Sequence, residues 1–196
     1  MKCNSRSKAV LVALLSVSLL TTGCSSEWIN IALADLPVLV QMALNIGTVV
    51  TTLQSGQQLS AADATAIQNI SNQASKDLNL LQALYNDYKA NANAATLQKI
   101  QGVVADINTN LPALLQATHI NDAALSTRVT TAVNLILATV NSCATLIPTT
   151  GAASANAKIA KANTPIPHAA DLKKQWNQQV CTARPGESVL VGCTLK

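Results

Sequence analysis

The sequence has few of the groups that enzymes and metal sites use. It contains two histidines, His119 and His168, and neither has a second His or Cys at metal-ligand spacing. Glu27 is the single Glu of the segment before residue 149, too few for a di-iron site. Gly-x-Ser-x-Gly, a phosphate-binding glycine loop and the haem motif Cys-x-x-Cys-His are absent. We therefore expect no enzyme activity, metal or cofactor.

Aromatic residues and excess charge are scarce as well. Phe is absent, and the chain has two Trp and two Tyr, so Leu, Ile, Val and Ala must supply the core. An Ala-rich chain with few aromatics favours helices over strands. Three of the 13 basic residues precede Cys24, which leaves 10 bases against 9 acids in the remainder. This balance does not indicate a nucleic-acid partner.

The first 23 residues have the three parts of a secretory signal peptide. Lys2, Arg6 and Lys8 come first, an apolar run at 9–15 follows, and the segment ends in Leu20-Thr21-Thr22-Gly23-Cys24. The apolar run is too short to span a membrane. The last five residues resemble the lipobox of bacterial lipoproteins, although Thr21 stands where Leu is commonest.

This resemblance implies cleavage before Cys24, lipidation of that cysteine and a lipid-anchored N-terminus at 24–26. Each buried methylene of an acyl chain contributes ~0.8 kcal/mol, and more than one chain makes the attachment durable. The alternative is an ordinary signal peptide that leaves Cys24 as a plain thiol. Ser25 and Ser26 follow in place of Asp, which resembles outer-membrane sorting in a Gram-negative source. We expect an exported protein, anchored on the periplasmic side or the surface of the envelope.

Residues 27–148 contain four stretches whose apolar residues recur at steps of three and four. Short polar turns join them, so we predict an all-α fold, specifically an antiparallel four-helix bundle. In the first stretch the predicted apolar stripe is Ile29, Leu33, Leu36, Val40, Ala43, Ile46, Val50 and Leu53. Pro37 should kink this helix or end it near Asp35. Polar residues through the first and fourth stretches oppose a membrane-spanning interpretation.

Several individual residues have expected roles in this bundle. We expect N-caps at Ser60, Asn93 and Asn121 for the second, third and fourth helices. Tyr85 and Tyr88 are placed at the bundle end with solvated hydroxyls, the alternative being an aromatic ligand clamp. Cys143 is expected to be a buried core thiol. His119 with Asp122 is only a weak hint of a site.

A change of charge near Pro148 marks the end of the bundle. Residues 27–147 carry four bases and seven acids, whereas 148–196 carry six bases and two acids. Residues 149–167 have little to bury and predict a mobile linker. Residues 168–196 predict a short helix with Trp176, followed by a loop closed by a Cys181–Cys193 disulfide worth about 3 kcal/mol. A tight Pro185-Gly186 turn would pair Cys181 with Leu190 and not with Cys193, so either the loop is wider or bulged, or no hairpin forms here.

Two classes of function agree with these features. The first is a lipid-anchored envelope protein with a structural or interaction role, whose polar helix faces or basic tail contact an envelope protein or polymer. The second is a binding module that holds an apolar small molecule inside a loosely filled bundle. A weaker third hypothesis is a pore-former whose uncharged helices open onto a membrane.

Overall fold

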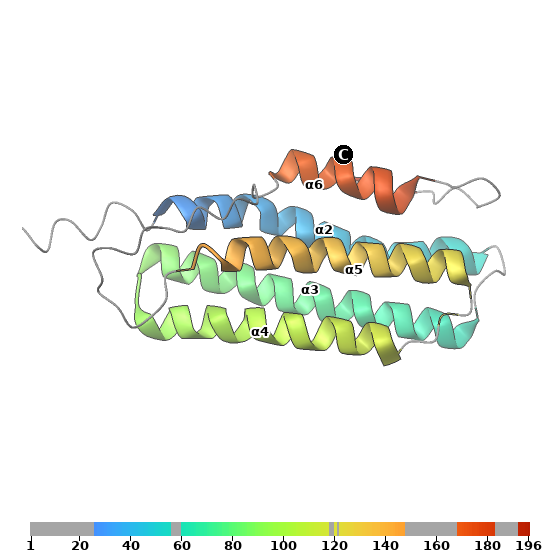
Figure 1. Ribbon diagram of the computed structural model, residues 1–196, viewed down its shortest axis with the longest axis horizontal. Helices are drawn as coiled ribbons and strands as arrows, with labels where there is room; N and C mark the ends of the chain where they lie inside the picture. The colour runs from blue at the N-terminus through green and yellow to red at the C-terminus, as the bar shows by residue number, and fades with distance from the viewer. Residues whose placement is uncertain (1–25, 56–59, 118–119, 121, 148–167, 183–191) are drawn as a thin grey trace, which may run out of the picture.

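The computed structural model describes residues 26–55, 60–117, 120, 122–147, 168–182 and 192–196 (Figure 1). These residues form helices and no strand, which confirms the all-α prediction for them. The signal peptide, Cys24, His119, the linker at 149–167 and the Pro185-Gly186 turn lie outside the described residues. The elements are α2 (Ser26–Ser55), α3 (Ala61–Ala90), α4 (Ala94–Ala117), α5 (Ala123–Ala144), α6 (Ala169–Trp176) and the π-helical turn η1 (Asn177–Cys181).

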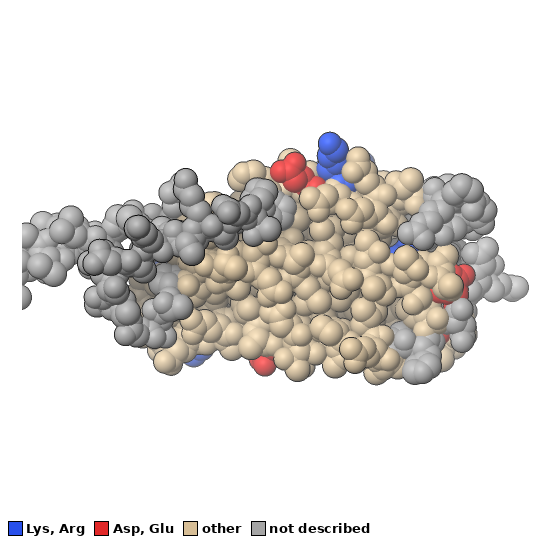
Figure 2. All heavy atoms as spheres, in the orientation of Figure 1, with Lys and Arg blue, Asp and Glu red and all other residues tan. Residues whose placement is uncertain are grey.

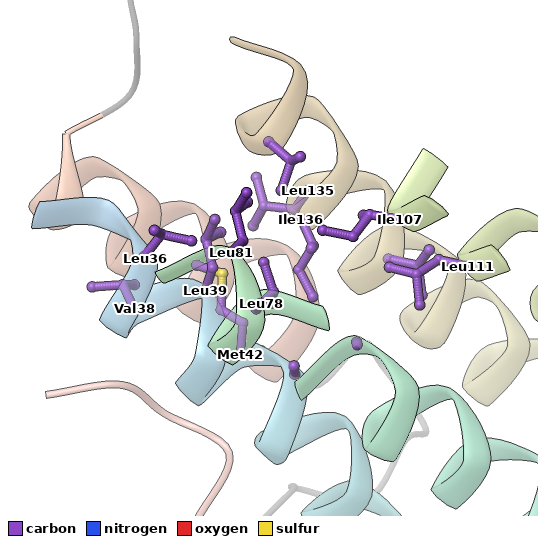
Figure 3. Packing of buried hydrophobic residues seen from close by; sticks show 14 of the residues in the cluster. Leu36, Val38, Leu39, Met42, Leu78, Leu81, Ile107, Leu111, Leu135 and Ile136 are labelled. Atoms are coloured by element: carbon purple, nitrogen blue, oxygen red, sulfur yellow. The ribbon is translucent and has the colours of Figure 1, made fainter. Parts of the chain in front are cut away.

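The four long helices lie side by side and share one aliphatic core. Helix α2 contacts α3 and α5, and α4 contacts the same two helices, so the contacts close a ring. Figure 1 shows the four long axes roughly aligned in a bundle-like arrangement. Side chains from all four helices meet in the interior (Figure 3), among them Leu39, Met42, Leu78, Leu81, Ile107, Leu111 and Ile136.

Local capping explains where three helices begin. The Ser60 hydroxyl accepts a hydrogen bond from the Asp63 backbone N–H at 3.1 Å, and the Asn93 side chain accepts one from Thr96 at 2.8 Å, so both predicted caps are confirmed. The predicted cap at Asn121 is wrong. Asp122 is the N-cap of α5, and its carboxylate accepts from the Leu125 backbone at 2.8 Å, where a negative charge also favours the helix dipole.

Helix α2 excludes one of the two alternatives predicted at Pro37 and has a wider buried face than the predicted stripe. It does not end near Asp35 but continues through Pro37 to Ser55, because the residues flanking the proline are buried and their packing offsets the lost hydrogen bond. Of the predicted stripe, Ile29, Leu36, Ala43 and Ile46 are buried, whereas Leu33 and Val40 are only partly buried. A second buried line lies beside it and consists of Trp28, Ala32, Asp35, Leu39, Met42 and Ile46.

Small residues allow close contact between α2 and α3. The hydroxyl of Ser71 donates a buried hydrogen bond to the Ala43 carbonyl at 2.7 Å. Gly47 lies one turn further along α2, and a Cβ atom there would be 2.9 Å from the Ser71 oxygen. A side chain at residue 47 would therefore collide with a hydrogen-bonded neighbour.

The C-terminal segment packs on the long helices instead of extending from them. Helix α6 contacts α2, and η1 contacts α5. Leu172 and Trp176 are fully buried, and Val180 and Leu195 are nearly so. The predicted helix carrying Trp176 is confirmed, as is the Cys181–Cys193 disulfide. The segment that was expected as a tail thus contributes part of the hydrophobic core.

Candidate functional site

Asp35 is a buried carboxylate in the middle of an otherwise apolar stripe. Its side chain is 2% exposed, and its Oδ2 atom finds no hydrogen-bond partner among the described residues. The carboxylate accepts a hydrogen bond from the backbone of Ala169, the first residue of α6. His168, the N-cap of α6, makes no side-chain capping bond. Asp35 of α2 therefore provides a hydrogen-bond acceptor at the start of α6, where the His168 side chain makes no capping bond.

The surroundings of Asp35 act on its ionisation in opposite directions. Burial raises its pKa, whereas the charge of His168 and the hydrogen bond from Ala169 lower it, and burial dominates. The carboxylate is consequently easier to protonate than an exposed aspartate. A buried charge of this kind reduces the stability of the fold when it is ionised.

Three further groups form a buried cluster with Asp35: Trp28, Tyr85 and Cys143. The rings of Trp28 and Tyr85 meet edge to face, with centroids 5.6 Å apart. Tyr85 is fully buried, and burial followed by the neighbouring Cys143 raises its pKa. The prediction of a solvated Tyr85 hydroxyl is wrong because Trp28 and α2 cover that end of α3. Tyr88 is also buried and its ring lies 6.0 Å from Trp28.

Cys143 is a buried, unpaired thiol, as predicted. Burial and the nearby charge of Asp35 raise the pKa of Cys143 to about 12. The thiolate is the nucleophilic form of cysteine, and it is scarce at neutral pH in this environment. The cluster therefore combines hydrogen-bond donors with one carboxylate and offers no activated nucleophile.

Polar atoms of the cluster remain unsatisfied. Within the described part of the chain, Trp28 Nε1, Asp35 Oδ2 and Tyr85 Oη lack partners. Buried polar atoms without a hydrogen bond are uncommon in folded proteins. Here the packing of the surrounding side chains must outweigh the free-energy cost of leaving these atoms unpaired. No group of three His, Cys, Asp or Glu side chains among the described residues could hold a metal ion.

A second set of polar contacts joins the last residues to α2 and α6. The Cys193 carbonyl accepts hydrogen bonds from Trp176 Nε1 at 2.9 Å and from Asn45 Nδ2 at 3.0 Å. The side chain of Asn177 donates to the Leu195 carbonyl at 3.0 Å and accepts from the Leu195 N–H at 2.8 Å. These bonds and the disulfide hold residues 192–196 against α6 and η1.

Open hollows lie on the described surface. One of about 490 Å³ lies between α2 and residues 192–196, beside Gln41 and Leu44. Another of about 450 Å³ lies between α3 and α4 beside Gln73 and Leu114. A void of about 10 Å³ next to Ile46 and Val180 has room for one water molecule at most.

Sequence reasoning missed Asp35 as a site residue. The available signal was its position in line with Trp28, Ala32 and Leu39, at steps of four, three and four. The stripe predicted from the sequence runs along the neighbouring line of residues, in which Ile29, Leu36 and Ala43 are buried, and does not include Asp35. The hydrogen bond from the Ala169 backbone to Asp35 could not be predicted, because residue 169 is distant from residue 35 in the sequence.

Comparison with known proteins gives no relative. No family model, no curated protein and no solved structure matches the chain. Two helical segments, Trp28–Thr48 of α2 and Ala123–Ala144 of α5, are long and apolar enough to cross a membrane by length and composition alone, and half of each is buried. Core helices of soluble proteins meet the same criterion.

Proposed function

We propose that the protein is a lipid-anchored protein of the cell envelope with a non-catalytic, structural or interaction role. The observation that carries the proposal is the distance between the lipobox-like motif and the fold. Helix α2 begins at Ser26, two residues after Cys24. Acyl chains on Cys24 would hold the start of α2 at the membrane surface without a spacer.

The mature part is proposed to be an antiparallel four-helix bundle. Its support is the order of the contacts, in which each long helix meets the next along the chain and α5 returns to α2. The connections are short, as between Ala90 and Ala94, and short connections favour antiparallel neighbours. Such a bundle presents long helix faces parallel to one another, which suits binding to an extended partner.

The exposed faces suggest the chemistry of that partner. Helix α5 has one charged residue, Arg128, and it is buried. The exposed positions of α5 include Thr127, Asn134 and Asn141. Figure 2 shows few charged side chains among the described residues on the face it displays. A partner that recognises this surface would use uncharged hydrogen-bonding groups, as an envelope polymer or the polar face of an envelope protein does.

The test is the intact mass of the protein from a membrane fraction of its own host, measured reduced and unreduced. We expect a chain that starts at Cys24 and carries acyl groups, with one disulfide. The Cys24→Ser variant, expressed with the same signal, should leave the membrane fraction. A wild-type mass without acyl groups, beginning near Ser25 or retaining the signal, would refute the anchored function.

A further inference from the structure

We propose that residues 192–196 and the adjoining part of α2 form a docking site for an extended, acidic segment of a partner polypeptide, which pairs with residues 192–196 as an added strand. This surface is separate from the exposed face of α5 and does not depend on acylation of Cys24. Three features of the molecule point to such a partner: the hollow beside α2, the hydrogen bonding of residues 192–196 and the charge around them.

The hollow between α2 and residues 192–196 has the size of a binding cleft. Its volume is about 490 Å³, and ligand-binding clefts commonly measure about 300–1,000 Å³. Leu44 of α2 borders the hollow and is 54% exposed, more than any other large apolar side chain among the described residues. Gln41 and Asn45 of α2 also line it. The hollow therefore offers apolar surface to a side chain and amide groups to a backbone.

Residues 192–196, here called the extended segment, show the alternation of an extended chain. Cys193 and Leu195 are buried, whereas Thr194 and Lys196 are exposed. Along an extended chain, the N–H and carbonyl of successive residues point to opposite edges. The backbone groups of Thr194 therefore lie on the edge opposite to those of Cys193 and Leu195.

The two edges of the extended segment differ in their hydrogen bonds. The Leu195 N–H donates to the Asn177 side chain, which in turn donates to the Leu195 carbonyl. The Cys193 carbonyl accepts from Trp176. By contrast, the N–H and carbonyl of Thr194 make no hydrogen bond to another described residue, and Thr194 borders the hollow. An edge with unpaired backbone groups can accept a further strand, which is how several peptide-binding domains hold their ligands.

The extended segment is held in place before any partner binds. The Cys181–Cys193 disulfide links it to η1, and the Cys193 carbonyl accepts a hydrogen bond from Asn45 of α2 at 3.0 Å. A backbone that already has its bound conformation loses little conformational freedom on binding. An added strand would run about 4.8 Å from the extended segment. It would therefore pass along the hollow, beside Leu44.

The charge around the hollow favours an acidic partner. Lys196 lines the hollow, and the Lys173 ammonium, which donates to the Lys196 carbonyl at 2.7 Å, adds a second positive charge. No Asp or Glu is among the described residues that line the hollow. A second copy of this chain would bring the same two lysines to the site, and like charges oppose that pairing. The partner segment should therefore alternate apolar residues, which contact Leu44, with Asp or Glu.

Amide NMR with synthetic peptides tests the inference on the whole exported chain, residues 24–196, carrying Cys24→Ser. The probe is a pool of end-blocked pentapeptides that alternate Asp or Glu with Val, Ile or Leu. One control pool has Lys in place of the acids, and another has N-methylated backbones, which cannot donate hydrogen bonds to a strand. At about 1 mM peptide, the acidic pool should shift the amide signals of Thr194 and Lys196 and slow exchange of the Thr194 amide severalfold. Neither control pool should do so.

Each contrary result refutes a particular part of the inference. Equal binding of the lysine pool would overturn the acidic partner, and equal binding of the N-methylated pool would overturn strand addition. The absence of shifts with every pool would overturn the site. Without peptide, a slowing of Thr194 exchange that grows with protein concentration would assign this edge to a second copy of the chain and overturn the proposed partner.

Matched exposed residues provide control variants. Leu44→Ala should weaken binding of the acidic pool about fivefold, because it removes apolar surface from the hollow, whereas Leu80→Ala on α3 should not change it. Lys196→Glu should also weaken binding, and Lys99→Glu on α4 should not. Equal affinities within either pair would contradict the proposal. The intact-mass experiment tests the lipid anchor separately, so a failure of peptide binding and a failure of the anchor are distinguishable.

Discussion

Two glycines in long helices provide a matched test of how α2 and α3 pack. Gly102 in α4 is exposed, and a Cβ atom there would meet nothing within 4 Å. Replacing a glycine inside an exposed helix by alanine stabilises a protein by about 1 kcal/mol, since the backbone loses less freedom on folding. Gly102→Ala should show this full gain.

Gly47→Ala should not show this gain in stability, because the new Cβ atom collides with the Ser71 side chain. Its new Cβ would lie 2.9 Å from the Ser71 hydroxyl oxygen and 3.3 Å from the Gln68 amide, and only the exposed Gln68 can move away freely. Ser71 could yield only by giving up its buried hydrogen bond to Ala43. An unsatisfied buried hydroxyl costs about 1–3 kcal/mol, so Gly47→Ala should be less stable than Gly102→Ala by a similar amount.

Urea unfolding followed by circular dichroism at 222 nm measures both variants against the wild type. A difference of 1 kcal/mol corresponds to about 2–4 °C in Tm for a chain of this size, so thermal melts provide a second reading. Ser71→Ala should cost less in the Gly47→Ala background than in the wild type, because it removes the colliding oxygen. If Gly47→Ala were as stabilising as Gly102→Ala, the proposed close contact between α2 and α3 would be wrong.

Four further predictions concern the buried groups and the disulfide. Asp35 has its folded-state pKa raised by burial, so its contribution to stability is greatest below the unfolded pKa and falls as pH rises through the folded pKa. Asp35→Asn should therefore raise the urea midpoint at pH 7 and weaken its dependence on pH, and an unchanged pH profile would contradict this. Tyr85→Phe removes a buried hydroxyl that lacks a partner among the described residues, so its unfolding free energy should stay equal or rise by up to about 1 kcal/mol. Cys143 should react with a thiol reagent at neutral pH only in denaturant, and fast reaction of the folded protein would refute its burial. The double variant Cys181→Ala/Cys193→Ala should lose about 3 kcal/mol in urea unfolding, and an unchanged midpoint would show that this loop does not constrain the unfolded chain.

The sequence was sufficient for features that depend on neighbouring residues. Steps of three and four predicted the helices, because side chains at that spacing share a helix face. Ser60 and Asn93 were identifiable as caps, since a cap bonds to backbone only three residues away. The Cys181–Cys193 pairing followed from the expectation of export and from the small number of cysteines nearby.

Tertiary structure alone decided how wide the buried face of α2 is and where the C-terminal segment lies. The packing of α3, α5 and α6 around α2 buries the line that contains Asp35 as well as Ile29, Leu36 and Ala43 of the predicted stripe. Two hydrogen bonds join residues more than 100 positions apart, one between Ala169 and Asp35 and one between Asn45 and Cys193. No local pattern encodes such a contact, because it exists only after the helices have packed and have brought distant backbone groups within hydrogen-bonding distance.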